Sequence, residues 1–151
     1  NVSIAGGTFT DNESPQNGGV FYGQDSSLVT MKGGKFENNR AQDGAVAVVT
    51  DGSTIQIEGG VYTGNAAERQ GGAFAAYGGT GIQITGGTFA NNTADYGGFL
   101  YKEGEGNTSC TGASILQHQG VDGGAIHAVD GAVLDWACDI GNNSAVAGPA
   151  M

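Results

Sequence analysis

One phrase recurs six times along this chain of 151 residues, and its regular spacing restricts the fold more than any other feature. A full copy has a glycine pair, an aromatic residue, an asparagine three residues after the aromatic, and a second glycine element. By subtraction, successive lead residues are 27, 26, 27, 26 and 25 residues apart, and a fixed period of roughly 20–50 residues is typical of solenoids. The lead residues are Phe9, Phe36, Tyr62 and Phe89, followed by Ile115 and Ile140 in two degenerate copies.

Each of the first four copies begins with two apolar residues at alternate positions, which is the pattern of one face of a strand. The glycine pair that follows displaces the aromatic by an odd number of residues, so we expect a bulge or bend there that returns the aromatic to the interior. In the last copy Leu134, Trp136, Cys138 and Ile140 alternate without a glycine pair. The apolar pairs are Val2 and Ile4, Val29 and Met31, Ile55 and Ile57, and Ile82 and Ile84.

The second glycine element begins another short strand, in which the apolar residue two after the glycine should point inward. Two or three short strands in about 26 residues, with no helical pattern, predict an all-β parallel β-helix of five to six coils. Residues 1–151 then form a single β-helix repeat segment. The expected inward residues are Phe21, Val46, Phe74, Leu100 and Ile126.

Coils of a β-helix stack at about 4.8 Å, so equivalent residues should form columns of like side chains. We predict an aromatic stack of Phe9, Phe36, Tyr62 and Phe89, and an asparagine ladder in which each amide donates to the next coil. His118 and Gly120 interrupt their columns, which predicts that the fifth coil is the least regular. The ladder residues are Asn12, Asn39, Asn65, Asn92 and Asn143, and a column of small residues contains Ser14, Ala41, Ala67, Ala94, Gly120 and Ala145.

The repeats resemble those of the polymorphic membrane proteins, which are chlamydial autotransporters with paired F-x-x-N and G-G-A-[ILV] tetrapeptides. Phe9–Asn12, Phe36–Asn39 and Phe89–Asn92 match the first motif, Tyr62–Asn65 is close to it, and Gly123–Ile126 matches the second. The resemblance covers nearly the whole chain and implies a right-handed, pectin-lyase-like β-helix on a cell surface, used in adhesion or structure. Variants of the second motif are Gly18–Phe21, Asp43–Val46, Gly71–Phe74 and Gly97–Leu100.

The formal charge is −10, from 15 acidic residues against five Lys and Arg. Such a surface repels nucleic acid and anionic membranes, so neither is an expected partner. No apolar run approaches the roughly 20 residues of a membrane span, so we expect no membrane insertion by this segment.

Pectate lyases and related polysaccharide enzymes also use β-helices, so catalysis is an alternative to a structural role. Lyase chemistry needs a basic residue near a carboxylate-bound calcium, but Arg40 and Arg69 do not share a column. We therefore expect no catalytic residues and no cofactor.

Carboxylates are expected to gather at two turns. They form a solvated acidic edge, or they bind Ca²⁺, which would relieve their repulsion. No D-x-D-x-D-G loop supports the calcium alternative. The acids are Asp43, Glu68, Asp95 and Asp122 at one turn, and Asp25, Asp51, Glu103 and Asp130 near the other.

Cys110 and Cys138 both have inward parity. Cys110 should stack on Trp136, which leaves a diagonal of about 8 Å between the cysteine Cα atoms, just beyond disulfide reach. A one-residue slip would allow the bond, and two cysteines in an extracellular chain favour pairing, so both states stay open.

Sequons at Asn1, Asn91, Asn107 and Asn142 could accept N-linked glycans in a eukaryotic secretory route. Asn107 is the best of them because we expect it in a polar loop, Lys102–Thr111. Asn12 also begins a sequon but should stay bare in the ladder.

The remaining polar signals are weak. His118 and His127 have no zinc-binding companions, and two aromatics are too few for a sugar-binding platform in the expected outward column of Tyr22, Ala47, Ala75, Tyr101 and His127. We therefore expect a non-catalytic structural or adhesive segment of an extracellular surface protein, appendage or filament. The alternative is a carbohydrate-active or carbohydrate-binding β-helix.

The expected partners are neighbouring β-helix segments or copies of the chain stacked end to end, and surface glycans or cell-surface proteins. The chain begins directly in the strand that contains Val2 and Ile4, and Gly148 starts the second glycine element of a sixth coil. We therefore expect a slice of a longer chain, or a subunit whose ends neighbours cover.

Overall fold

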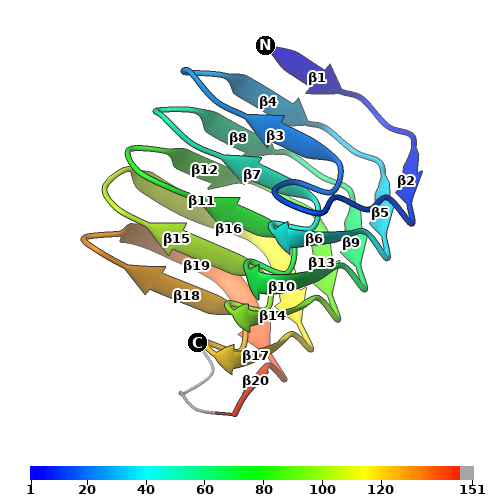
Figure 1. The fold of residues 1–151 in the computed structure, drawn as a ribbon, viewed down its shortest axis with the longest axis vertical. Coiled ribbons are helices and arrows are strands. Elements are labelled where there is room, and N and C mark those ends of the chain that lie inside the picture. The colour runs from blue at the N-terminus through cyan, green and yellow to red at the C-terminus, as the bar shows by residue number, and fades with distance from the viewer. Residues whose placement is uncertain (147–151) are drawn as a thin grey trace.

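The computed structural model describes residues 1–146, which form an all-β, right-handed parallel β-helix of six coils (Figure 1). The fold class predicted from the repeat is confirmed. A complete coil has four short strands, where two or three were expected. None of the described elements is a helix long and apolar enough to cross a membrane. Gly148, which should start the next glycine element, lies outside the described residues.

The first two strands of each coil build one continuous sheet, because β16 and β19 pass through the corner that separates them in the other coils. The first stack contains β1 (Val2–Ile4), β4 (Leu28–Met31), β8 (Thr54–Ile57) and β12 (Gly81–Ile84). The second contains β2 (Thr8–Thr10), β5 (Lys35–Glu37), β9 (Val61–Thr63) and β13 (Thr88–Ala90). Both continue into β16 (Asn107–Leu116) and β19 (Val133–Gly141).

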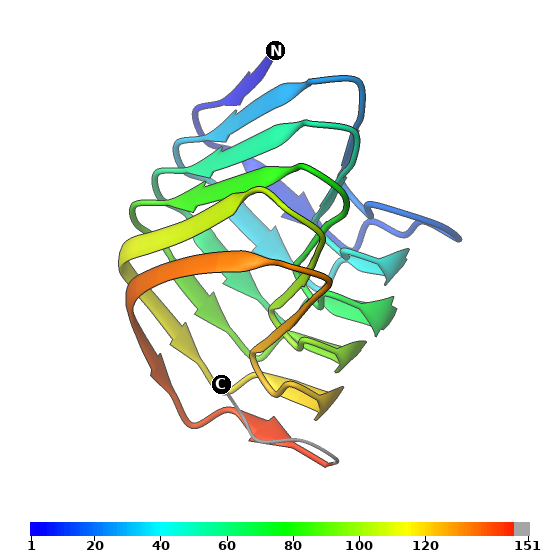
Figure 2. The same ribbon diagram turned by 90° about the vertical axis from the view of Figure 1, so that its left-hand side faces the viewer.

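The other two strands of each coil form two further sheets. The projecting sheet extends away from the body of the β-helix (Figure 2) and contains β6 (Arg40–Asp43), β10 (Ala66–Gln70), β14 (Thr93–Tyr96), β17 (Gln119–Asp122) and β20 (Ser144–Ala145). The front sheet faces the viewer in Figure 1 and contains β3 (Phe21–Gly23), β7 (Ala47–Val49), β11 (Phe74–Ala76), β15 (Leu100–Glu103) and β18 (Ile126–Val129).

The corner between the first and second strands is the bend that the glycine pairs predict. The second glycine of the pair has a positive φ, 111° at Gly34, 108° at Gly60 and 113° at Gly87, which side chains rarely adopt. In the fifth coil the corner becomes a bulge inside β16, where the register with β19 shifts between Thr111 and Ser114.

Two columns run through the interior. The rings of Phe9, Phe36, Tyr62 and Phe89 stack with centroids 4.7 Å apart and planes within 13° of parallel. Beside them, the Asn39 side chain donates to Asn65 Oδ1 at 2.9 Å, and the side chains of Asn39, Asn65 and Asn92 each also donate to a backbone carbonyl oxygen. The ladder runs through Asn12, Asn39, Asn65, Asn92, His118 and Asn143.

In the second coil, the strand that follows the second glycine element pairs with its neighbours one residue away from the expected position. Phe74 pairs with Ala47, so the motif there is Gly44–Ala47 rather than Asp43–Val46, and Ala47 rather than Val46 belongs to the inward column. The reason is the first glycine of the element, which has φ between 54° and 67° in each of the first five coils. A Cβ at Gly71 would lie 1.9 Å from the Phe74 carbonyl oxygen, so this position excludes every side chain.

The fifth coil keeps its register at the two residues that were expected to disturb it. Ala94 pairs with Gly120 without a shift, and His118 takes a place in the ladder. A Cβ at Gly120 would lie 2.5 Å from the Gly123 carbonyl oxygen, so glycine is required there. The fifth coil is irregular, but at the bulge between Thr111 and Ser114 and not at His118 or Gly120.

Candidate functional site

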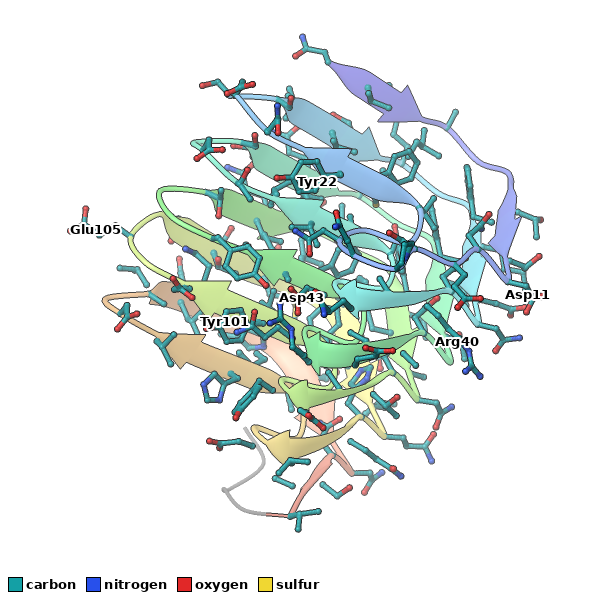
Figure 3. The ribbon with its side chains drawn as sticks, in the orientation of Figure 1. Asp11, Tyr22, Arg40, Asp43, Tyr101 and Glu105 are labelled. Carbon is teal, nitrogen blue, oxygen red and sulfur yellow. A yellow bond between two sulfur atoms is a disulfide. The ribbon has the colours of Figure 1, made fainter. Side chains whose placement is uncertain are left out.

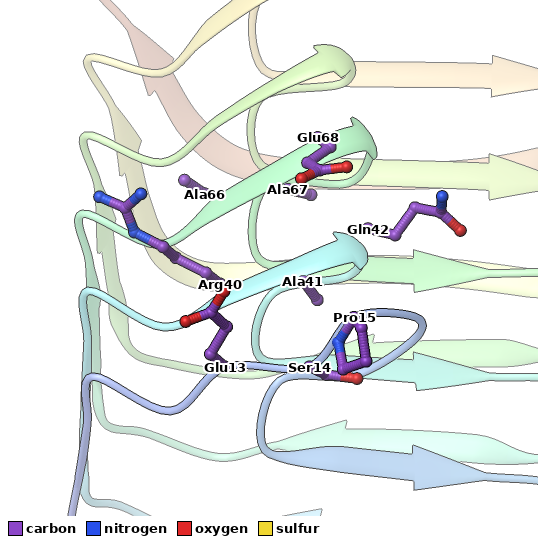
Figure 4. A pocket seen from close by; sticks show the side chains of 9 residues that line it. All are labelled: Glu13, Ser14, Pro15, Arg40, Ala41, Gln42, Ala66, Ala67 and Glu68. Atoms are coloured by element: carbon purple, nitrogen blue, oxygen red, sulfur yellow. The ribbon is translucent and has the colours of Figure 1, made fainter.

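One face of the projecting sheet carries a groove, which we call the axial groove, that runs along the axis of the β-helix. It consists of two hollows of about 360 and 330 Å³ that share Ala67, and Figure 4 shows the first of them. Its floor belongs to the predicted column of small residues, in which Ala67 pairs with Ala41 and Gly120 pairs with Ala94, and these short side chains leave space above them. These floor residues are Ala41, Ala67, Ala94 and Gly120.

The rims of the axial groove supply hydrogen-bonding side chains from every coil. Glu13, Arg40 and Glu68 surround the first hollow (Figure 4), and the backbone of Glu13 pairs with that of Arg40. Thr93 and Gln119 follow in the same column as Arg40, on the rim of the second hollow. Guanidinium, amide, hydroxyl and carboxylate groups together can both donate to and accept from a ligand rich in hydroxyl groups.

Where the projecting sheet approaches the front sheet, a crease holds a small outer core. Val48 and Ala75 are buried there although they point away from the interior, and they pack with Tyr101, Tyr77 and Val129. Val48, rather than Ala47, therefore occupies the outward column between Tyr22 and Ala75.

The tyrosines of the crease are held in their neutral form. Burial raises the pKa of Tyr77, whose hydroxyl donates to Gln70 Oε1 at 2.5 Å. Burial, and then a 2.9 Å hydrogen bond to Glu103, raise the pKa of Tyr101. Stacking covers the Tyr101 ring, since His127 lies parallel to it with centroids 5.5 Å apart. The crease is thus packed rather than open.

Asp43 lies buried in this crease, near Tyr101 in Figure 3. Its carboxylate is buried and accepts from Arg69 Nη2 at 2.6 Å and from Nε at 3.3 Å. The hydrogen bond and the charge of Asp43 raise the pKa of Arg69. Arg40 lies in another column, opposite Ala66, so the two arginines do not meet.

The acidic column expected at this turn is wrong. Asp43 pairs with Gln70 and not with Glu68, because β10 has one extra residue and its register shifts between Ala67 and Gln70. Tyr96 continues the column in the next coil, where Asp95 was expected, and Asp122 then pairs with Tyr96.

At the second turn, three of the four expected acids occupy equivalent left-handed positions. Asp25, Asp51 and Asp130 have φ between 53° and 56°, and the intervening coils have glycines with positive φ at Gly78 and Gly104. Glu103 instead accepts from Tyr101. Within residues 1–146, no three His, Cys, Asp or Glu side chains gather closely enough to hold a metal ion.

Lys102 is a buried cation that sequence reasoning placed in a polar loop. It lies in β15, and its Nζ donates to the carbonyl oxygens of Gly78, Glu103, Gly104 and Glu105 at 2.7–3.2 Å. Burial lowers its pKa. The ammonium group therefore ties the turn after β15 to the coil before it, while the Glu105 side chain extends outward (Figure 3).

The sequon residues are all exposed, but Asn107 is not in a loop. It begins β16 and pairs with Val133, so the expected loop Lys102–Thr111 is mostly strand. Asn91 and Asn142 have φ of 55° and precede the ladder residues at the same turn, two coils apart. Asn12 donates to Asn39 Oδ1 as the first rung of the ladder.

Cys110 and Cys138 form a disulfide that joins the fifth coil to the sixth. Cys110 pairs with Trp136, as the expected register has it. The cysteine Cα atoms are nevertheless 5.5 Å apart rather than about 8 Å, and Cys110 lies just before the bulge between Thr111 and Ser114, where the pairing of the two strands is irregular. Disulfides persist in oxidising compartments, which include the cell exterior.

No protein-family model, curated protein or solved structure matches this chain. The function is therefore inferred from its own interior and surfaces. Of these, the axial groove is a hollowed, solvated surface with side chains that are not engaged in the core. Sequence reasoning found its floor as a column of small residues, but nothing in the pattern shows that the strand projects.

Proposed function

We propose that this chain is a non-catalytic structural or adhesive segment of an extracellular surface protein, an appendage or a filament. The observation that carries the proposal is the uninterrupted interior: the aromatic stack and the ladder bind every coil to the next, which makes a stiff rod. The resemblance to polymorphic membrane protein repeats and the disulfide both favour the cell surface. Stacked neighbouring segments or copies of the chain are the natural partners of such coils.

The axial groove favours a more specific form of adhesion, in which the rod binds a carbohydrate chain. The groove crosses several coils at a spacing of about 4.8 Å each, so an extended ligand would meet one pair of rim residues per coil. Three of the charged rim residues, Glu13, Glu68 and Asp95, are acidic and one, Arg40, is basic, which disfavours a polyanion and suits a neutral, hydroxyl-rich glycan.

The proposal is tested on an array of neutral and acidic glycans, with the protein displayed on fluorescent beads. Ala66 lines the groove, so Ala66→Trp should fill it and reduce binding. Val61 is exposed on the neighbouring strand β9, outside the residues that line the groove, so Val61→Trp is the matched control and should bind like the wild type. Binding to no neutral glycan, or equal binding by both variants, would remove the groove from the proposal.

The enzymatic alternative has its own readout in the same samples. Incubation with neutral and acidic polysaccharides should release no new reducing or unsaturated ends. Turnover that disappears in Arg40→Ala but persists in Val61→Trp would replace the structural proposal with a carbohydrate-active one.

A further inference from the structure

His118 occupies the asparagine position of the ladder and reproduces its hydrogen bonds with a titratable ring. In the coil before it, Asn92 Oδ1 accepts from the Asn65 backbone N–H at 2.9 Å, and the Asn92 side chain donates to the Tyr62 carbonyl oxygen. In the fifth coil His118 Nδ1 accepts from the Asn92 N–H at 3.1 Å, and Nε2 faces the Phe89 carbonyl oxygen at 3.1 Å.

These two contacts fix the protonation state of the ring. A backbone N–H can only donate and a carbonyl oxygen can only accept, so Nδ1 must be bare and Nε2 must carry the proton. The ring is completely buried, and burial lowers the pKa of His118 from 6.5 to about 4. Protonation of Nδ1 would remove the acceptor of the Asn92 N–H and place a positive charge in the core.

The groups that touch the ring offer no compensating charge. Its hydrogen-bond partners are Asn92 and Phe89, its backbone N–H donates to Asn143 Oδ1 at 2.8 Å, and the Phe99 ring lies against it with centroids 5.4 Å apart. None of these four residues titrates. The other described histidine, His127, lies on β18 and faces Asp122 at 3.8 Å instead.

We propose that His118 is an acid-sensitive joint of the rod, at which a proton from solvent binds Nδ1 and loosens the junction between the fourth and fifth coils. The disulfide joins the fifth and sixth coils, so both should loosen together. This regulatory property goes beyond the proposed structural or adhesive function and does not depend on any ligand.

The sign of the pH dependence follows from the lowered pKa. The opened form binds the proton with the ordinary pKa of about 6.5, and the closed form binds it only near pH 4. The closed junction is therefore fully favoured above pH 6.5, and opening increases as the pH falls from 6.5 to 4. At pH 4.5 the equilibrium constant for opening should be higher on the order of 10- to 100-fold.

Amide hydrogen exchange, corrected for the intrinsic effect of pH, tests this at single residues. The Asn92 N–H should lose protection between pH 7 and pH 4.5, while the Asn65 N–H, which donates to an asparagine in the same way, is the internal control. His118→Asn restores the ladder residue and should keep Asn92 protected at pH 4.5. His127→Asn should behave like the wild type.

Two outcomes would overturn the joint. One is a wild-type ratio of Asn92 to Asn65 protection that does not change with pH, and the other is an equal acid loss in His118→Asn. Should that variant fail to fold, the nitrogen chemical shifts of the wild-type His118 ring decide the question. If the ring keeps its contacts and yet titrates with a midpoint near pH 6.5, the proposal is refuted.

Discussion

Replacement of Asn65 by alanine tests the ladder at its centre. The Asn65 side chain takes part in four hydrogen bonds of 2.9–3.0 Å, two as acceptor from Asn39 and two as donor to Phe36 and Asn92. Some of these partners keep a second bond: the Asn39 amide still donates to the Phe9 carbonyl oxygen, and Asn92 Oδ1 still accepts from the residue 65 N–H. The Asn39 backbone N–H loses the acceptor that the structure shows for it.

The expected loss of stability follows from that count. One buried donor without an acceptor costs about 1–3 kcal/mol, and the loss of the side-chain bonds to Phe36 and Asn92 adds to it. We therefore expect Asn65→Ala to lower the free energy of unfolding by about 2–3 kcal/mol. Asn12→Ala is the matched control, because Asn12 donates to an oxygen that also accepts from the Asn12 backbone N–H. That change should cost less than about 1 kcal/mol.

Urea unfolding followed by circular dichroism measures both values, with the midpoint interpreted at a constant m-value. The reasoning fails if Asn65→Ala unfolds at the wild-type midpoint. It also fails if Asn12→Ala costs as much as Asn65→Ala, since the loss would then not depend on how many partners remain.

Three further changes test other parts of the rod. Phe36→Ala opens a cavity between two rings at 4.7 Å and should cost about 3–5 kcal/mol in the same unfolding assay. Gly71→Ala and Gly78→Ala start from φ of 65° and 67°, but an added Cβ lies 1.9 Å from a carbonyl oxygen only at Gly71. Gly78→Ala should therefore cost about 1–2 kcal/mol and Gly71→Ala more than twice as much; equal costs would contradict the clash. Reduction of Cys110–Cys138, which are 28 residues apart, should cost about 3–4 kcal/mol, and a melting temperature unchanged by reductant would contradict this.

The columns of the interior could be predicted because F-x-x-N keeps its internal spacing in each copy. Phe36 pairs with Tyr62, and Phe89 pairs with Ile115, as counting from the lead residues expects. Apolar and amide side chains are confined to these positions by burial, so period and side-chain chemistry agree.

Counting failed where one coil contains an extra residue. The segment from Glu68 to Gln70 is polar throughout, so the bulge in β10 leaves no break in hydropathy, and Asp43 was assigned the wrong partner. Counting also missed the bulge in β16 and gave too long a distance between Cys110 and Cys138. Bulges are set by backbone geometry and hydrogen bonding, which a pattern of residue types records only where glycine marks them.

The repeat also explains why the sequence says so little about a ligand. The residues that define the phrase point inward and bind one coil to the next, so they cannot recognise anything outside. Recognition must come from outward positions, and these do not repeat: the groove column reads Arg40, Ala66, Thr93, Gln119 and Ser144. Rim residues two coils apart are separated by roughly 10 Å, a distance at which effects of substitutions usually add. Each coil can therefore change its rim without disturbing the interior, so binding specificity in this rod should be the sum of nearly independent contributions from its coils.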